Sequence, residues 1–85
     1  MRTRRLGQTG IRIGAIGLGC GPMSRVNGPT DDNESTLTLN RALDLGVNFL
    51  DTAEDYGKDS HNESLIGTAL KGRRDGAVIC SKFGV

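Results

Sequence analysis

The chain has 85 residues, of which 35% are hydrophobic and 4% aromatic, enough for one small domain at most. Eleven Lys and Arg against ten Asp and Glu leave a net charge of +1, which argues against a nucleic-acid-binding protein. No apolar run approaches the roughly 18 residues that cross a bilayer. The basic start Met1–Arg5 is followed by no apolar signal segment. We therefore expect a cytoplasmic protein with neither nucleic-acid nor membrane partners.

The two cysteines, Cys20 and Cys80, lie far apart in the sequence. Their number and spacing fit neither a disulfide framework nor a zinc site. We expect both to be packed, reduced thiols and expect no bound metal.

The first half of the chain predicts a hairpin, a buried strand and a helix. Arg5–Ile13 has a turn at Gly7–Gly10 and alternating residues after it, which is typical of a hairpin. Ala15–Cys20 is a short apolar run that predicts a strand, and Gly21–Pro29 predicts a loop. A helix is expected to begin within Thr30–Glu34, where Asp31 and Glu34 form a capping box. Its apolar face is Leu39, Ala42 and Leu43, and Gly46 suits its end.

The second half repeats the pattern of strand and helix. Val47–Thr52 predicts a second buried strand, followed by the loop Ala53–Asp59. Ser60 with Glu63 predicts a second capping box, and His61 is expected to be a surface residue at the helix start. The apolar face of this helix is Leu65, Ile66, Ala69 and Leu70. Ala77–Lys82 predicts a third strand.

The order of elements is therefore a hairpin followed by β-α-β-α-β, which predicts an α/β fold with a parallel sheet and right-handed crossovers. The outer edges of the first and third strands have no obvious partner. We expect residues 1–85 to form a partial domain that is truncated after its third strand. The alternative is a chain that completes its sheet with another copy.

Polar side chains gather where these strands end. Asp51 closes the second strand, Tyr56 follows it, and Lys82 closes the third. The carboxyl edge of a parallel sheet is where sites are built. Tyrosine has an ordinary pKa near 10, which a nearby ammonium group lowers. A carboxylate beside the lysine would hold it, so the three groups predict a proton donor for a carbonyl oxygen.

The motifs around these residues closely resemble the aldo-keto reductase family. The downstream ones are DTAEDYG at 51–57, NE at 62–63, IG at 66–67, ALKGRR at 69–74 and SKFG at 81–84. The upstream ones are LGQTG at 6–10, GLGC at 17–20 and RALDLGV at 41–47. The resemblance covers nearly the whole chain and is closest to the bacterial and plant branch whose first strand ends in Gly-Leu-Gly-Cys.

This resemblance implies about one third of a (β/α)8 TIM barrel, closed at its amino-terminal end by the hairpin. It implies an oxidoreductase that uses NADP(H) without a metal to interconvert small carbonyls and alcohols. Tyr56 matches the proton donor, Lys82 the lysine that lowers its pKa, and Asp51 the carboxylate paired with that lysine. The nicotinamide end of the cofactor would contact Gly21, Pro22, Met23, Asp51 and Tyr56.

Three observations limit this interpretation. The family's fourth catalytic residue is a histidine after strand four, and His61 does not match it. The glycines from Gly17 do not form a Rossmann fingerprint, since the sixth place is Pro22 and a loop follows. Taken without the motifs, Tyr56 would be an ordinary loop residue and Lys82 a solvated lysine. The alternative function is a truncated, non-catalytic polypeptide that self-associates or aggregates through its open sheet edges.

Overall fold

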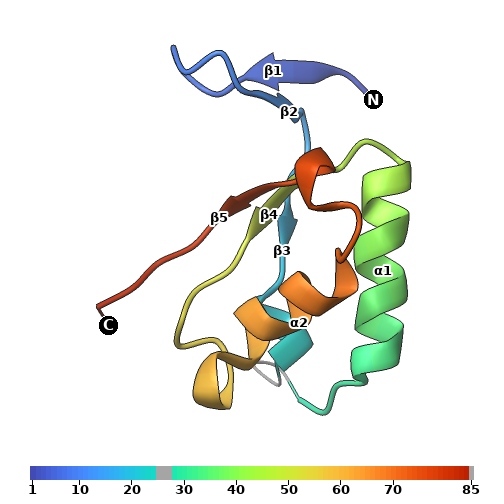
Figure 1. Cartoon of the computed structure of the whole chain (residues 1–85), viewed down its shortest axis with the longest axis vertical. Helices are drawn as coiled ribbons and strands as arrows, with labels where there is room; N and C mark the ends of the chain where they lie inside the picture. Colours follow the sequence, from blue (N-terminus) through green and yellow to red (C-terminus); the bar gives the residue numbers. More distant parts are fainter. Residues whose placement is uncertain (25–27, 85) are drawn as a thin grey trace.

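The computed structural model describes residues 1–24 and 28–84 as a mixed α/β fold (Figure 1). It begins with an antiparallel hairpin of β1 (Thr3–Arg5) and β2 (Arg12–Gly14). The hairpin lies beyond one end of the sheet and is joined to it by Asn48, whose Oδ1 accepts a 2.7 Å hydrogen bond from the Gly14 amide. The predicted hairpin is confirmed.

The sheet consists of three parallel strands, with β4 in the centre. They are β3 (Leu18–Gly19), β4 (Phe49–Asp51) and β5 (Val78–Cys80), in the order β3-β4-β5. In this register Asp51 lies opposite both Gly19 and Cys80. All three strands are shorter than the apolar runs predicted, although some hydrogen bonds between the strands continue beyond their ends, as from the Cys20 amide to the Asp51 carbonyl and from the Thr52 amide to the Cys80 carbonyl.

Within residues 1–24 and 28–84, two helices and three short 3-10 turns lie between the strands. Helix α1 (Asp32–Asp44) and helix α2 (His61–Ala69) pack against each other and cover the same face of the sheet (Figure 1). The turns are η1 (Gly21–Ser24), η2 (Lys58–Ser60) and η3 (Arg74–Gly76). The predicted order of hairpin and β-α-β-α-β is therefore confirmed. Residues 25–27 of the predicted loop lie outside the described residues, as does Val85.

One of the two predicted helix caps is confirmed and the other is wrong. Asp31 caps α1, because its Oδ1 accepts hydrogen bonds from the amides of Asn33 and Glu34. Within the described residues the Glu34 side chain forms no hydrogen bond back to the Asp31 amide, so the cap is present without the second half of the predicted capping box. Ser60 caps nothing, because it enters α2 in the left-handed conformation, with φ +57°. A capping side chain requires extended backbone to reach the first turn. Glu63 accordingly takes part in no capping box. Its carboxylate instead accepts a hydrogen bond from the hydroxyl of Ser81, just after β5.

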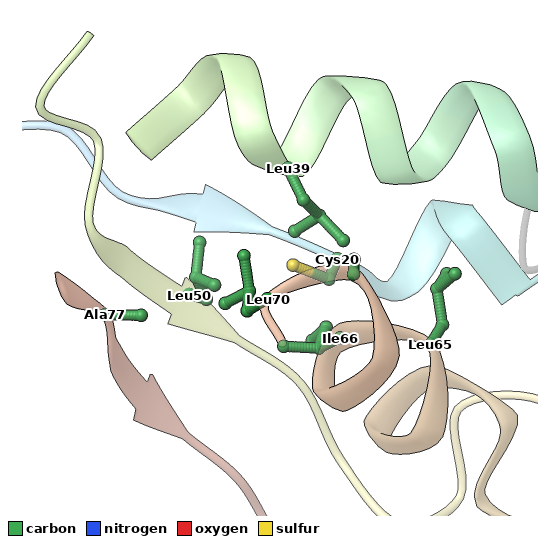
Figure 2. Close-up of a cluster of buried hydrophobic side chains, with 8 residues drawn as sticks. Cys20, Leu39, Leu50, Leu65, Ile66, Leu70 and Ala77 are labelled. Carbon is green, nitrogen blue, oxygen red and sulfur yellow. The ribbon is translucent and has the colours of Figure 1, made fainter. Parts of the chain in front are cut away.

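The hydrophobic core lies between the sheet and the two helices (Figure 2). Its buried members are Cys20, Leu39, Leu50, Leu65, Ile66, Ala69, Leu70 and Ala77. The predicted apolar face of α2 is fully confirmed, whereas in α1 only Leu39 is fully buried. Burial raises the pKa of Cys20 to about 11, so this thiol stays neutral near pH 7.

Cys80 corrects the prediction of two packed thiols. Side chains alternate along a strand, so while Ile79 packs against the core, Cys80 points to the opposite face of the sheet. No helix covers that face in the described part of the chain, and Cys80 is exposed. Neither described helix is long and apolar enough to cross a membrane.

The core predicts a large difference between two leucines of α1. Leu39 is completely buried, whereas Leu37 is 71% exposed. We expect Leu39→Ala to lower the free energy of unfolding by about 2–5 kcal/mol, because it leaves a cavity between α1 and the sheet. Leu37→Ala should change it by less than about 0.5 kcal/mol. Urea denaturation of the two variants measures the difference, and equal losses would contradict this description of the core.

Candidate active site at the carboxyl edge of the sheet

Asp51, Tyr56 and Lys82 meet at the carboxyl edge of the sheet. Asp51 is the last residue of β4, Tyr56 lies in the loop that follows, and Lys82 comes directly after β5. The Lys82 ammonium donates a 2.8 Å hydrogen bond to Asp51 Oδ1. Its nitrogen also lies 5.2 Å from the centre of the Tyr56 ring. The structure thus brings together the three side chains that the sequence placed at one edge.

The backbone helps to hold this arrangement. The Glu54 amide donates to the Lys82 carbonyl over 2.9 Å, so the segment after β5 continues alongside the segment after β4. The Glu54 carboxylate accepts a hydrogen bond from the Gly84 amide two residues further on. Lys82 therefore lies on a backbone that is fixed on both sides of it.

The pairing with Asp51 shifts the pKa of Lys82 upward. The main cause is the hydrogen bond to the Asp51 carboxylate, which favours the charged ammonium form. The two side chains are 47% and 51% exposed, so water and salt screen their attraction. Lys82 is consequently a full positive charge at neutral pH, located beside a phenol ring.

The segment after β3 approaches the site through Gly21. This residue is buried, and a Cβ atom added to it would lie 3.4 Å from Tyr56 Cε2. The Tyr56 ring thus packs directly against the backbone of η1. The two residues after Gly21 were also predicted to contact a cofactor: Pro22 is exposed, and Met23 packs against the core.

A buried polar cluster behind the site was not predicted. Asn62 is completely buried and forms hydrogen bonds with Thr52, Ser24 and the carbonyl of Cys20. The signal in the sequence is that Asn62 lies on the same helical face as Leu65, Ile66 and Ala69. A polar residue on an apolar face is normally buried with specific partners.

His61 is also more involved than a surface residue would be. Its Nδ1 lies 2.6 Å from the Ser24 hydroxyl, and its Nε2 lies 3.0 Å from Asp32 Oδ1. It therefore links η1 to the first turn of α1, and the predicted surface position is only half correct. Among residues 1–24 and 28–84, no cluster of three or more His, Cys, Asp or Glu side chains could hold a metal ion.

Most of the chain matches a known protein family. Residues 15–85 match the model of the Aldo/keto reductase family. The chain belongs to the aldo-keto reductase family. The family resemblance found in the motifs is therefore confirmed.

Relatives and solved structures support the assignment along almost the whole chain. The chain is 36% identical to the Bacillus subtilis oxidoreductase YqkF over 84 residues, which are 99% of this chain and 26% of that protein. It is 38% identical to L-galactose dehydrogenase of Arabidopsis thaliana over 68 residues, which are 80% of this chain and 21% of that protein.

Solved aldo-keto reductases share the fold of this chain. A Pseudomonas aeruginosa structure described as an aldo-keto reductase superposes with a TM-score of 0.82 at 41% identity, over 96% of this chain and 31% of that one. The holo form of a Bacillus halodurans aldo-keto reductase gives 0.82 at 37% identity, over 99% and 26%. The chain thus spans between a fifth and a third of the length of these family members.

The ion pair in this aldo-keto reductase predicts a measurable shift in the pKa of Lys82. Because the Asp51 carboxylate raises that pKa, the pair stabilises the fold at pH values below the ordinary lysine value of 10.5. This contribution is lost as the pH rises through the raised pKa of Lys82. We expect Asp51→Asn to lower that pKa toward 10.5, as measured by an NMR titration of the lysine side chains.

The control for this titration is Asp55→Asn. Asp55 is an exposed carboxylate in the same loop and is not among the groups that shift the pKa of Lys82. It should leave that pKa unchanged. Equal effects of the two variants would mean that the pair with Asp51 is not the cause.

Proposed function

We propose that this chain is the amino-terminal part of an NADP(H)-dependent oxidoreductase that interconverts small carbonyl compounds and alcohols. Family membership supports the class of reaction. The observation that carries the proposal is the position of the Lys82 ammonium, which binds Asp51 and also lies against the Tyr56 ring. As parts of the same proposal, the protein acts in the cytoplasm and has neither nucleic-acid nor membrane partners.

Tyr56 is the proposed proton donor. A carbonyl oxygen gains negative charge during reduction and needs a proton from a positioned group. When Tyr56 releases its proton, the phenolate that forms is stabilised by the positive charge of Lys82. Asp51 holds that ammonium group in place and balances its charge. In alcohol oxidation the same groups accept the proton.

The residues after β3 and β4 fit the nicotinamide end of NADP(H). Gly19 is exposed, and a Cβ atom added to it would meet nothing within 4 Å, so a flat ring has room beside this backbone. The residues that would hold the ring are Gly21, Pro22, Met23, Asp51 and Tyr56. When bound, the cofactor supplies or accepts a hydride.

The chain covers only part of each relative, so the first experiment asks whether the coding sequence continues. Because the chain spans at most about a third of each aligned family member, the proposed activity belongs to a longer protein. Sequencing the coding DNA beyond the Val85 codon tests this. Further strand–helix units with a histidine after the next strand would support the proposal, and a stop codon would overturn it for this polypeptide.

Replacement of Tyr56 tests the catalytic assignment in that longer protein. We expect Tyr56→Phe to reduce kcat by about 10²–10⁴-fold, because it removes only the hydroxyl that donates the proton. Turnover is followed by NADPH absorbance with a panel of small aldehydes and ketones. Binding of NADPH, measured by its fluorescence, should be retained.

Two lysines provide the matched control. Lys82→Met should lower kcat by a similar factor, whereas Lys58→Met, in the exposed turn η2, should not. Full turnover by Tyr56→Phe would remove the catalytic assignment. Equal losses in the two lysine variants would mean that position 82 has no special role.

A second candidate function is self-association of a non-catalytic chain. It is favoured by an apolar groove of about 500 Å³ beside β3, which includes the exposed residues Ile16, Leu37 and Leu45. In the described residues, β3 and β5 each pair only with β4, so the outer edge of each is open. Open edges and exposed apolar side chains both promote pairing of copies.

Sedimentation of the 85-residue chain tests this second candidate. We expect the unmodified chain to form dimers or larger species at micromolar concentration. Leu37→Asp should shift the distribution toward monomer by placing a charge in the groove, and Thr68→Asp, on the exposed part of α2, should not. A stable monomer across the concentration range would contradict self-association.

A further inference from the structure

The Asn62 side chain forms three hydrogen bonds inside the protein. It is completely buried, and its amide nitrogen donates to the Cys20 carbonyl over 2.7 Å and to the Ser24 hydroxyl over 2.8 Å. Its Oδ1 accepts from the Thr52 hydroxyl over 2.6 Å. No step of the proposed reaction involves Asn62, so its burial requires another explanation.

The partners fix which way the amide points. The Cys20 carbonyl can only accept, so the nitrogen of Asn62 must face it. The oxygen then faces Thr52, whose hydroxyl can donate. The amide group therefore has one satisfied orientation, and a rotated side chain would leave buried polar atoms without partners.

These partners lie beside the proposed catalytic and cofactor-binding groups. Cys20 and Ser24 lie on either side of the segment Gly21–Met23, and Thr52 directly follows Asp51. In addition, the backbone amide of Asn62 donates to the Tyr56 carbonyl over 3.1 Å. One residue thus contacts both ends of the segment after β3 and two points of the loop after β4.

The next residue extends these contacts to the third strand. The Glu63 carboxylate accepts a 2.7 Å hydrogen bond from the hydroxyl of Ser81, which directly precedes Lys82. Two consecutive residues at the start of α2 therefore connect the ends of β3, β4 and β5.

We propose that Asn62 and Glu63 are positioning residues that hold the proton donor, its lysine and the cofactor-binding segment in one arrangement. This inference rests on the proposed function, and neither residue touches the reacting atoms. Reacting groups must be held to within a fraction of an ångström, and a 1 Å displacement can reduce the rate by about 100-fold. Groups on a helix supply that precision better than groups on loops do.

A nucleophilic serine is the competing interpretation of the same cluster. Ser24, His61 and Asp32 line a pocket of about 640 Å³ and follow the order of hydroxyl, imidazole and carboxylate. However, Ser24 is only 6% exposed and its oxygen already accepts from Asn62. The hydroxyl is therefore fixed as a link between Asn62 and His61, and the chain of hydrogen bonds continues to α1.

Variants of Asn62 and Thr52 test the positioning role in the longer protein, with NADPH and 4-nitrobenzaldehyde as probes. We expect Asn62→Ala to lower kcat by about 10–100-fold and to raise the KM for NADPH, since the segment after β3 loses its anchor. Thr52→Val retains the side-chain shape and removes the donor to Asn62, so it should have a smaller effect in the same direction. Thr52→Ser retains the hydroxyl and should restore kcat.

The control for lost stability is Asn40→Ala. Asn40 donates to the Ala69 carbonyl and so connects α1 to α2 away from the site. It should lower the unfolding midpoint in urea without lowering kcat at temperatures where the protein is folded. For Glu63, the Glu63→Gln variant still accepts from Ser81 and should retain kcat, whereas Glu63→Ala should lower it.

Hydrogen exchange separates failure of the proposed function from failure of the positioning role of Asn62. We expect Asn62→Ala to increase amide exchange at Gly21, Met23, Ser24 and Tyr56 far more than Asn40→Ala does. No turnover by the unmodified protein, with this exchange pattern present, would overturn the proposed function and leave the structural role. Normal kcat and normal exchange in Asn62→Ala would overturn the positioning inference alone. The positioning inference would also be overturned if Asn40→Ala lowered kcat as much as Asn62→Ala does.

Discussion

The pairing of β4 with both neighbouring strands determines where every group of the candidate site lies. Asp51 is opposite Gly19 on one side and Cys80 on the other. Because the three strands are parallel and end at the same level, the residues that follow them enter the same space. A shift of β4 by one residue would turn Leu50 out of the core and Asp51 into it, so burial of Leu50 also fixes the position of the carboxylate.

Helix α2 adds a second constraint that the sheet alone cannot supply. Its apolar residues Leu65, Ile66 and Ala69 pack against the sheet, and this fixes the height and rotation of the helix. Asn62 and Glu63 lie at its amino-terminal end, next to the strand ends. Core packing and the polar contacts of the site therefore depend on the same helix.

The features that could be predicted from sequence are those with a local physical signal. Short apolar runs and helical spacing indicated the order of the elements, and the strand ends indicated that Asp51, Tyr56 and Lys82 would meet. The prediction that Cys80 is packed is wrong because the third apolar run does not reveal that, in the described residues, helices cover only one face of the sheet. The predicted cap at Ser60 is wrong because Ser60 leaves η2 with a left-handed backbone. The spacing of Ser60 and Glu63, on which the prediction is based, does not indicate that conformation. The contacts of Asn62 join residues far apart in sequence, so spacing could reveal only that its position on an apolar face needs partners.

The exposure of the ion pair explains why positioning matters more here than attraction between charges. Lys82 and Asp51 are both about half-exposed, and water weakens their interaction. A ligand bound over this edge would exclude water and lower the local dielectric constant, so the ammonium group would act on the Tyr56 phenol more strongly. That gain requires the three groups to be in place before the ligand arrives. The buried contacts of Asn62 and the hydrogen bond between Glu63 and Ser81 meet this requirement, because they hold the ends of the three strands through helix α2.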